Sequence, residues 1–80
     1  MKTTDPTQII RMTLHEVAPE ADLDRLAPTA DFRDALELDS LDFLRFVELL
    51  SERTGRRIDE YDYDQLATVS DAAAFLSAPF

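Results

Sequence analysis

Apolar residues near the start of the chain recur at intervals of three and four, the spacing that places them on one face of an α-helix. The positions are Ile9, Ile10, Met12 or Thr13, Leu14 and Val17. Asp5 precedes them as a helix cap, and Pro6 suits the first helical position. Pro19 cannot continue a helix. The pattern therefore predicts a first helix that begins at residues 5–6 and is ended by Pro19.

A long connection follows at roughly residues 19–38, and it contains Pro19, Pro28 and scattered Asp and Ala. A structureless loop of that length is unusual in a small domain. We therefore expect apolar side chains to hold the connection against the core, namely Leu23, Leu26, Phe32, Leu36 and Leu38. The stretch "DFRDAL" (31–36) is typical of a short turn of helix with Asp31 as its cap.

A second long helix is predicted from about Ser40 to Arg53, with Ser40 as its N-cap and Gly55 placed to terminate it. Its apolar stripe comprises Leu41, Leu44, Phe46 or Val47, and Leu50. Phe43 and Phe46 are each also a candidate for an exposed contact. The residues expected in the core of the protein are Leu44, Phe46, Val47, Leu50, Ile58, Val69 and Phe75.

The last third of the chain predicts a short acidic helix at 59–66, anchored by Ile58 and Leu66, and then a final helix. Thr68 opens the final helix with a Thr-x-x-Asp variant of the capping box. Pro79 closes it, and its buried face is Ala72, Ala73, Phe75 and Leu76. We therefore predict an all-α fold over residues 1–80. It is a single domain, a small four-helix bundle with three main helices, one short helix and a long first loop.

The composition suits a small soluble domain, with 45% hydrophobic and 31% charged residues and no cysteine. Seventeen acids against eight bases give a net charge of −9, which disfavours nucleic acids and anionic membranes as partners. Proteins with basic patches fit this charge, although acidity also serves solubility alone. No run approaches the roughly 20 apolar residues of a membrane span, so no membrane insertion is expected. The opening "MKTTDPTQII" is no secretory signal, so we expect a cytoplasmic protein.

Ser40 lies between Asp39 and Asp42 at the start of the second long helix, and its role has to be weighed. A catalytic serine needs a neighbouring base, and the only histidine, His15, falls on the first helix as an expected surface or boundary residue. There is no G-x-S-x-G motif, and no glycine near Ser40 that could build an oxyanion hole. No catalytic residues are therefore predicted. Two roles of Ser40 remain open: it is a simple helix cap, or it is a site that another enzyme modifies.

The segment "LELDSLDFLRFVELL" (36–50) resembles the Asp-Ser-Leu motif of acyl carrier proteins. The resemblance extends to Phe32 and Leu36 before the serine, to "TG" (54–55) and to "LATVSDAAAFL" (66–76). It implies that Ser40 carries 4′-phosphopantetheine, whose thiol holds an acyl or aminoacyl group as a thioester. It also implies that Asp39 and Leu41 present the serine to a phosphopantetheinyl transferase, with Leu41 as an exposed apolar contact for that enzyme and for other partners. A loading ligase, acyl transferases or synthases would be further partners.

The sequence departs from that family at three positions. Glu37 stands where a glycine is common, and Arg45 and Glu48 stand where many fatty-acid carriers have an acid and a methionine. By resemblance, the helix after the serine is the docking face for partner enzymes. The expected docking residues are Asp42, Arg45, Glu48 and Glu52. A specialised, free-standing and monomeric carrier is the resulting expectation.

The acidic segment "DEYDYD" (59–64) invites a calcium site, but it lacks the glycine and the final glutamate of an EF-hand loop. We therefore predict no metal site. Tyr61 and Tyr63 are too close in sequence to share a face, so one should pack and the other should be exposed. By resemblance, this segment borders the space where an acyl chain can sit. The candidate cargo-pocket residues are Leu44, Phe46, Ile58, Tyr61, Tyr63 and Leu66.

The sequence leaves the cargo, the pathway and the loading enzyme open. Fatty-acid, polyketide, peptide-type aminoacyl and surface-modification systems all use such carriers. An unmodified acidic helical protein-interaction module is the alternative from a different class. A small hydrolase that uses Ser40 is the remotest alternative.

Overall fold

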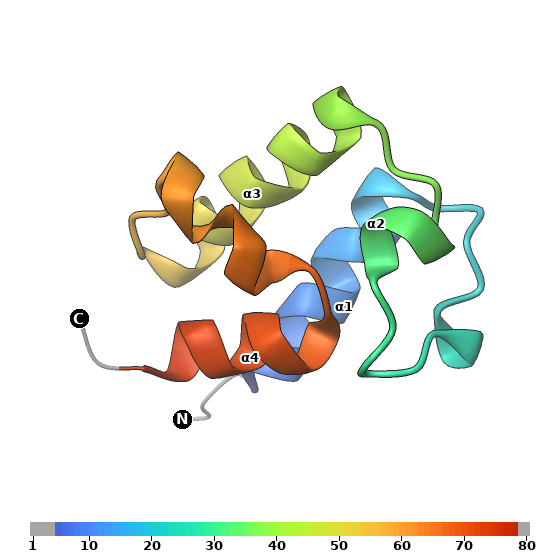
Figure 1. The fold of residues 1–80 in the computed structure, drawn as a ribbon, viewed down its shortest axis with the longest axis horizontal. Helices are drawn as coiled ribbons and strands as arrows, with labels where there is room; N and C mark the ends of the chain where they lie inside the picture. The colour runs from blue at the N-terminus through green and yellow to red at the C-terminus, as the bar shows by residue number, and fades with distance from the viewer. Residues whose placement is uncertain (1–4, 79–80) are drawn as a thin grey trace.

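A computed structural model of the protein describes residues 5–78, and its regular elements are helices (Figure 1). The α-helices are α1 Pro6–Val17, α2 Phe32–Ala35, α3 Ser40–Thr54 and α4 Val69–Ser77. Two 3₁₀ segments are η1 Leu23–Arg25 and η2 Glu60–Leu66. The predicted all-α fold is confirmed. The structure adds η1, which was not predicted, and Pro79, expected to close the last helix, lies outside the described residues.

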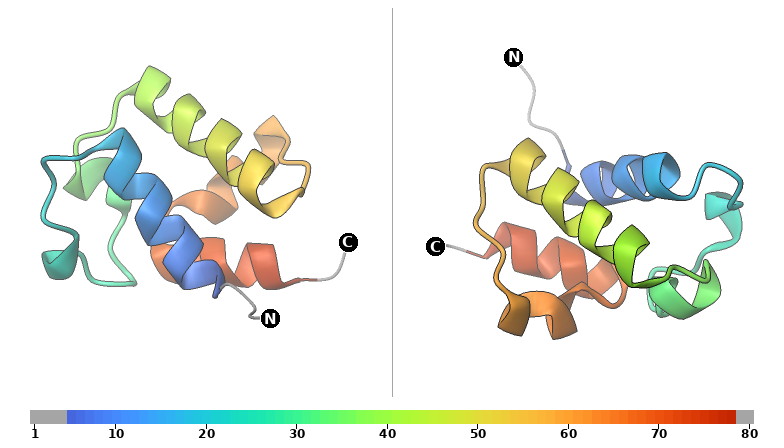
Figure 2. Two further views of the ribbon diagram at one scale, coloured as in Figure 1. Left: turned by 180° about the vertical axis from the view of Figure 1, so that it is seen from behind. Right: turned by 90° about the horizontal axis from the view of Figure 1, so that it is seen from above.

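The three longest helices surround one apolar core. α1 packs against both α3 and α4, and η2 packs against α4 (Figures 1 and 2). Phe32 and Phe46 are completely buried and meet edge to face, with their ring centroids 5.1 Å apart. The core as a whole consists of Ile10, Leu14, Leu26, Phe32, Leu38, Phe43, Phe46, Val47, Leu50, Leu66, Val69, Ala72 and Phe75.

The long connection between α1 and α3 is held to the rest of the molecule at several points, as predicted. Leu26, Phe32 and Leu38 are buried, and Leu23 and Leu36 are half-buried against the same core. Two backbone hydrogen bonds and one side-chain hydrogen bond add to this anchoring. The Phe32 N–H donates to the Ala67 carbonyl (2.9 Å), the Ser70 N–H donates to the Pro28 carbonyl (3.0 Å), and the Arg11 side chain donates to the Leu23 carbonyl (2.9 Å).

Most helix ends lie where local sequence signals place them. Asp5 accepts a hydrogen bond from the Thr7 N–H, Asp31 from the Arg33 N–H, and Thr68 from the Asp71 N–H, each at 3.0 Å. These bonds satisfy backbone donors that have no partner inside a helix. Gly55 ends α3 in the left-handed conformation (φ 69°) that glycine adopts without steric cost. The predicted caps at these four positions are confirmed.

The buried face of α3 differs from the predicted stripe. Phe43, Phe46, Val47 and Leu50 are buried, whereas Leu44 is 43% exposed and Leu41 is 77% exposed. Placing Leu44 in the core was wrong. Leu41 was expected both in the apolar stripe and, by resemblance, as an exposed contact, and its exposure fits the second expectation. The predicted stripe and the observed buried face both have helical spacing. Phe43 is the buried member because Tyr63 on η2 packs against its ring edge to face (5.2 Å between centroids).

A buried polar contact joins α1 to α3. Thr13 is completely buried, and its hydroxyl donates to the Ile9 carbonyl (2.7 Å). The same hydroxyl accepts a hydrogen bond from the Arg53 guanidinium (3.1 Å), which also pairs with Glu16. Thr13, and not Met12, therefore occupies the inward position that the sequence left undecided. No helix among residues 5–78 is long and apolar enough to cross a membrane.

Candidate functional site

Asp39, and not Ser40, caps the second long helix. The backbone of Asp39 is extended (φ −84°, ψ −178°), and its Oδ1 accepts a hydrogen bond from the Asp42 N–H at 2.8 Å. Ser40 is already the first residue of α3. The prediction of Ser40 as the N-cap was therefore wrong by one residue. The carboxylate of Asp39 stabilises the start of α3 in two ways. It accepts a hydrogen bond from an N–H group that has no partner inside the helix, and its negative charge interacts favourably with the helix dipole.

The displacement of the cap leaves the Ser40 hydroxyl available. Ser40 is exposed, and none of the hydrogen bonds found between residues 5 and 78 uses its Oγ. An activated nucleophile needs a base within hydrogen-bond reach. His15 is exposed on α1, where it shares a shallow surface hollow with Met12 and Leu23. The Ser40 hydroxyl is thus exposed and outside the cap, and no base in the described structure is bonded to it.

The turn that delivers the chain to Ser40 is a Schellman motif at the end of α2. The Leu38 N–H donates to the Arg33 carbonyl (2.9 Å), and the Glu37 N–H donates to the Asp34 carbonyl (3.2 Å). Glu37 takes the left-handed position of this motif (φ 56°), which glycine usually occupies. Glu37, which stands where the family commonly has glycine, is therefore the one non-glycine residue in the described structure with a positive φ.

The candidate docking residues lie on α3. Arg45, Glu48 and Glu52 are exposed, and their spacing places them on one face together with the exposed Leu41. Asp42 is half-buried in the first turn. Leu44 also lies at this surface, which the sequence analysis missed. Its spacing of three and four residues from Leu41 and Glu48 was the available signal. The docking role of these residues stays a prediction.

The six candidate cargo-pocket residues have very different environments. Phe46 and Leu66 are completely buried, Ile58 and Tyr63 are half-buried, and Leu44 and Tyr61 are exposed. The expectation that one tyrosine packs and the other is exposed is confirmed, because Tyr63 packs on Phe43 and Tyr61 is 81% exposed. None of the six lines the hollow at His15 or the larger hollow beside the end of α1.

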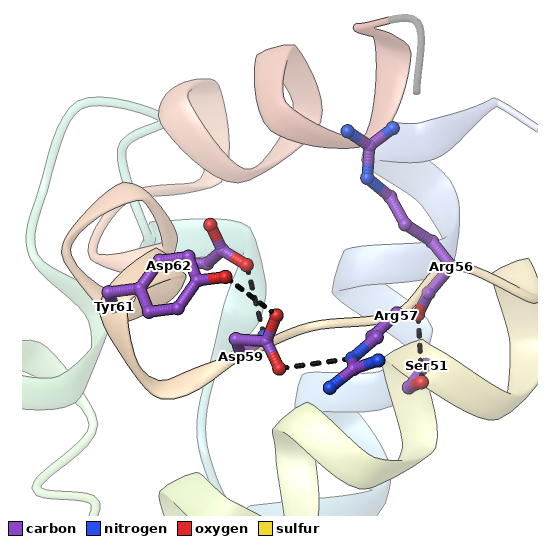
Figure 3. Close-up of polar contacts among 6 residues, drawn as sticks. All are labelled: Ser51, Arg56, Arg57, Asp59, Tyr61 and Asp62. Carbon is purple, nitrogen blue, oxygen red and sulfur yellow. Dashed lines mark hydrogen bonds and ion pairs between the residues drawn. The ribbon is translucent and has the colours of Figure 1, made fainter.

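Tyr61 belongs to a polar network at the start of η2 (Figure 3). Its hydroxyl donates to one carboxylate oxygen of Asp59 (3.1 Å), and the Arg57 guanidinium donates to the other (3.1 Å). The hydrogen bond to the Asp59 carboxylate raises the pKa of Tyr61 above its ordinary value, because that bond favours the neutral phenol. The Asp59 N–H donates to Asp62, which closes the turn into η2. These contacts give the acidic segment a structural role.

A hollow of about 730 Å³ lies between the end of α1 and the long connection. Its apolar lining includes Ala18, Leu26 and Leu36. Glu37 and Asp42, on either side of Ser40 in the sequence, also line it, so it opens close to the attachment candidate. Nothing in the sequence analysis pointed to this hollow, because its walls come from segments that only the tertiary structure brings together.

Comparison with known protein families agrees with the site. A family model described as the phosphopantetheine attachment site matches residues 8–76, from the first turn of α1 to the last turn of α4. The match contains the Asp-Ser-Leu segment at 39–41 and the helices that position it. Because the match covers most of the chain, this protein belongs to the phosphopantetheine-attachment family as a carrier domain of the acyl carrier protein type, and the prosthetic group of that family is 4′-phosphopantetheine.

Proposed function

We propose that Ser40 is the attachment point of 4′-phosphopantetheine and that the protein carries an acyl or aminoacyl group as a thioester on that arm. The observation that carries the proposal is the state of Ser40. It is exposed at the first position of α3, its hydroxyl is outside the cap hydrogen bond, and it lies within the Asp-Ser-Leu segment of a chain that belongs to the family.

The surroundings of Ser40 fit the attached group. The Ser40 and Leu41 N–H groups have no hydrogen-bond partner in the described structure, and such N–H groups at a helix start favour a phosphate. Asp39 turns its carboxylate toward its own helix, which holds α3 in place. The chain has no cysteine, so the thiol that forms the thioester comes with the arm.

The loading reaction belongs to another enzyme. A phosphopantetheinyl transferase joins the Ser40 oxygen to the phosphorus of the pantetheine arm of coenzyme A. The hydroxyl proton and adenosine 3′,5′-bisphosphate leave. Leu41, next to the serine and 77% exposed, offers that enzyme an apolar contact. The protein itself supplies the serine and its presentation, and it performs no catalysis.

The outer face of α3 is the docking surface in this proposal. Glu48 and Glu52 attract basic patches on the loading ligase and on acyl transferases or synthases. Arg45 interrupts the negative field of this face, so partners tuned to a uniformly acidic helix should bind less well. A monomeric cytoplasmic carrier that serves a specialised pathway is the setting we propose.

Intact mass measurement tests the assignment. We expect the wild-type chain to gain one phosphopantetheine when it is incubated with coenzyme A and a broad-specificity transferase, and Ser40→Ala to gain none. Ser70→Ala is the matched control, because Ser70 is also exposed near the start of a helix, and it should load normally. Circular dichroism should show that all three proteins are folded.

Two results would contradict the proposal. Loading of the Ser40→Ala protein would place the arm elsewhere. A folded wild-type chain that gains no mass would favour an unmodified acidic interaction module. If loading succeeds, mass spectrometry of the protein isolated from its native cell identifies the cargo.

A further inference from the structure

We infer that Arg33 is a phosphate-binding residue that positions the arm attached to Ser40. The inference rests on the proposed function and adds a contact from α2, a helix that neither the Asp-Ser-Leu motif nor the docking face includes. It assigns a purpose to an arginine that the sequence analysis did not single out.

The Arg33 side chain lies against α3 close to its start. Its guanidinium carbon lies 4.1 Å from the centroid of the Phe43 ring, within the range of a cation–π contact. Phe43 follows Ser40 by three residues on α3. Side chains three apart on a helix are neighbours, with their β-carbons about 5–6 Å apart. The charge of Arg33 therefore lies against the first turn of α3, over a residue that neighbours Ser40 on the helix.

The backbone keeps Arg33 at this place. The Arg33 carbonyl accepts the hydrogen bond from the Leu38 N–H (2.9 Å), so α2 is folded back against the segment that leads into Ser40. Leu38 is buried, and Asp31 caps the first turn of α2. Arg33 thus projects from a short turn that is anchored to the segment leading into Ser40.

The charge of Arg33 is not used in an ion pair of the described structure. Four other arginines each pair with a carboxylate, in the pairs Arg11–Asp24, Arg25–Asp22, Arg53–Glu16 and Arg57–Asp59. Within residues 5–78, no ion pair involves Arg33. In a chain with seventeen acids, an arginine without a carboxylate partner beside the attachment serine is available for another anion. A phosphodiester on Ser40 would be such an anion.

The chemistry of the guanidinium suits phosphate. Its N–H groups lie in one plane, where they can donate to two oxygens of one anion. The Ser40 and Leu41 N–H groups at the start of α3 have no hydrogen-bond partner in the described structure and would donate to the same phosphate. The alternative is a purely structural role in which Arg33 only covers Phe43, which is 2% exposed. The two roles predict different responses to loading.

The experiment compares thermal stability before and after loading. The melting temperatures of the unloaded and loaded forms are measured for the wild type, Arg33→Gln and Arg57→Gln, and intact mass confirms that loading is complete. Loading should raise the wild-type melting temperature by about 3–6 °C, the size of response expected from one charge-assisted contact in a domain of this size. Arg33→Gln should lose most of this rise, and Arg57→Gln should keep it.

Arg57 is the matched control because it carries the same charge and is exposed, and it lies beyond the opposite end of α3 from Ser40. The loss of the cation–π contact with Phe43 lowers the melting temperatures of the loaded and the unloaded Arg33 variant equally. It therefore cancels in the difference between these two temperatures. Arg33→Lys keeps the charge without the planar group and should retain part of the rise. In nitrogen-15 spectra, the Arg33 side-chain N–H signal should move on loading.

The inference is overturned if loading raises the melting temperature equally in the wild type and in Arg33→Gln, or if the Arg33 side-chain signal does not move. A failure of the proposed function is recognised separately, because the wild-type chain then gains no mass and no loaded form exists. In that case the inference falls with it.

Discussion

At the scale of single residues, the conformation of Glu37 is the least expected feature of the chain. It is held at φ 56°, where the β-carbon of an L-residue approaches the following carbonyl and costs roughly 1–2 kcal/mol. The two hydrogen bonds of the Schellman motif hold it there. The strain lies three residues before Ser40, in the turn that sets the direction in which the chain enters α3.

This strain can be measured by comparing Glu37→Gly with Glu37→Ala. Both substitutions remove the carboxylate, but only glycine removes the β-carbon. We expect the glycine variant to have the higher free energy of unfolding by about 0.5–1 kcal/mol, since the larger entropy of unfolded glycine offsets part of the relief. Urea denaturation measures the difference. Equal stability of the two variants would show that the left-handed conformation costs nothing at this position.

At the scale of elements, the start of α3 gives the cap to Asp39 and leaves Ser40, the proposed attachment point, outside the cap. Asp39 closes the helix with its hydrogen bond to the Asp42 N–H (2.8 Å), and Ser40 follows with a free hydroxyl. A cap must keep its side-chain oxygen bonded to its own helix. A serine that caps α3 would therefore have to give up that bond when its oxygen becomes an ester. The observed arrangement avoids the conflict.

The division of roles predicts unequal effects of two neighbouring substitutions. Asp39→Ala should lower the free energy of unfolding by about 1 kcal/mol, because a backbone N–H of α3 loses its acceptor. Asp39→Asn keeps an acceptor oxygen and should lose less. Ser40→Ala should change stability by less than about 0.5 kcal/mol. Urea denaturation of the unloaded proteins tests this, and a cost for Ser40→Ala as large as that for Asp39→Ala would make the serine the cap after all.

At the scale of the whole molecule, the charges are unevenly distributed along α3. Glu37, Asp39 and Asp42 lie around the serine end and outnumber Arg33 there, while Arg53 and the neighbouring Arg56 and Arg57 lie at the other end. The helix has 15 residues and is therefore roughly 22 Å long, nearly three times the screening length of about 8 Å at physiological salt. The two ends thus present separate fields to an approaching partner, and the end with Ser40 is the negative one.

The net charge of −9 predicts that salt stabilises the fold. Repulsion among the excess carboxylates opposes the compact state. The screening length, beyond which exposed charges barely interact, falls from about 30 Å at 0.01 M salt to about 8 Å at 0.15 M. Added sodium chloride should therefore weaken this repulsion. The exposed ion pairs lose a little stability at the same time, but each contributes less than about 1 kcal/mol. Urea midpoints should therefore rise between these two salt concentrations, and a fall would mean that the ion pairs outweigh the repulsion.

The sequence by itself determined the helices and the place of the attachment candidate. The caps at Asp5, Asp31 and Thr68 and the terminator Gly55 act through contacts within a few residues, so their pattern was sufficient. The Asp-Ser-Leu segment and the spacing around it pointed to the family in the same way. The role of Ser40 as cap was the local error, because Asp39 competed for the same N–H and both residue types suit that position.

The tertiary structure alone decided which face of α3 is buried and what surrounds the serine. Phe43 and Leu44 fit a helical stripe equally well, and only the packing of Tyr63 and Arg33 on the Phe43 ring selects between them. The hollow beside Glu37 and the place of the Arg33 charge likewise arise from segments that are distant or differently oriented along the chain. Helical spacing restricts a residue to an arc of the helix surface, and the elements that pack on that arc determine whether the residue lies in the core, at the site or in solvent.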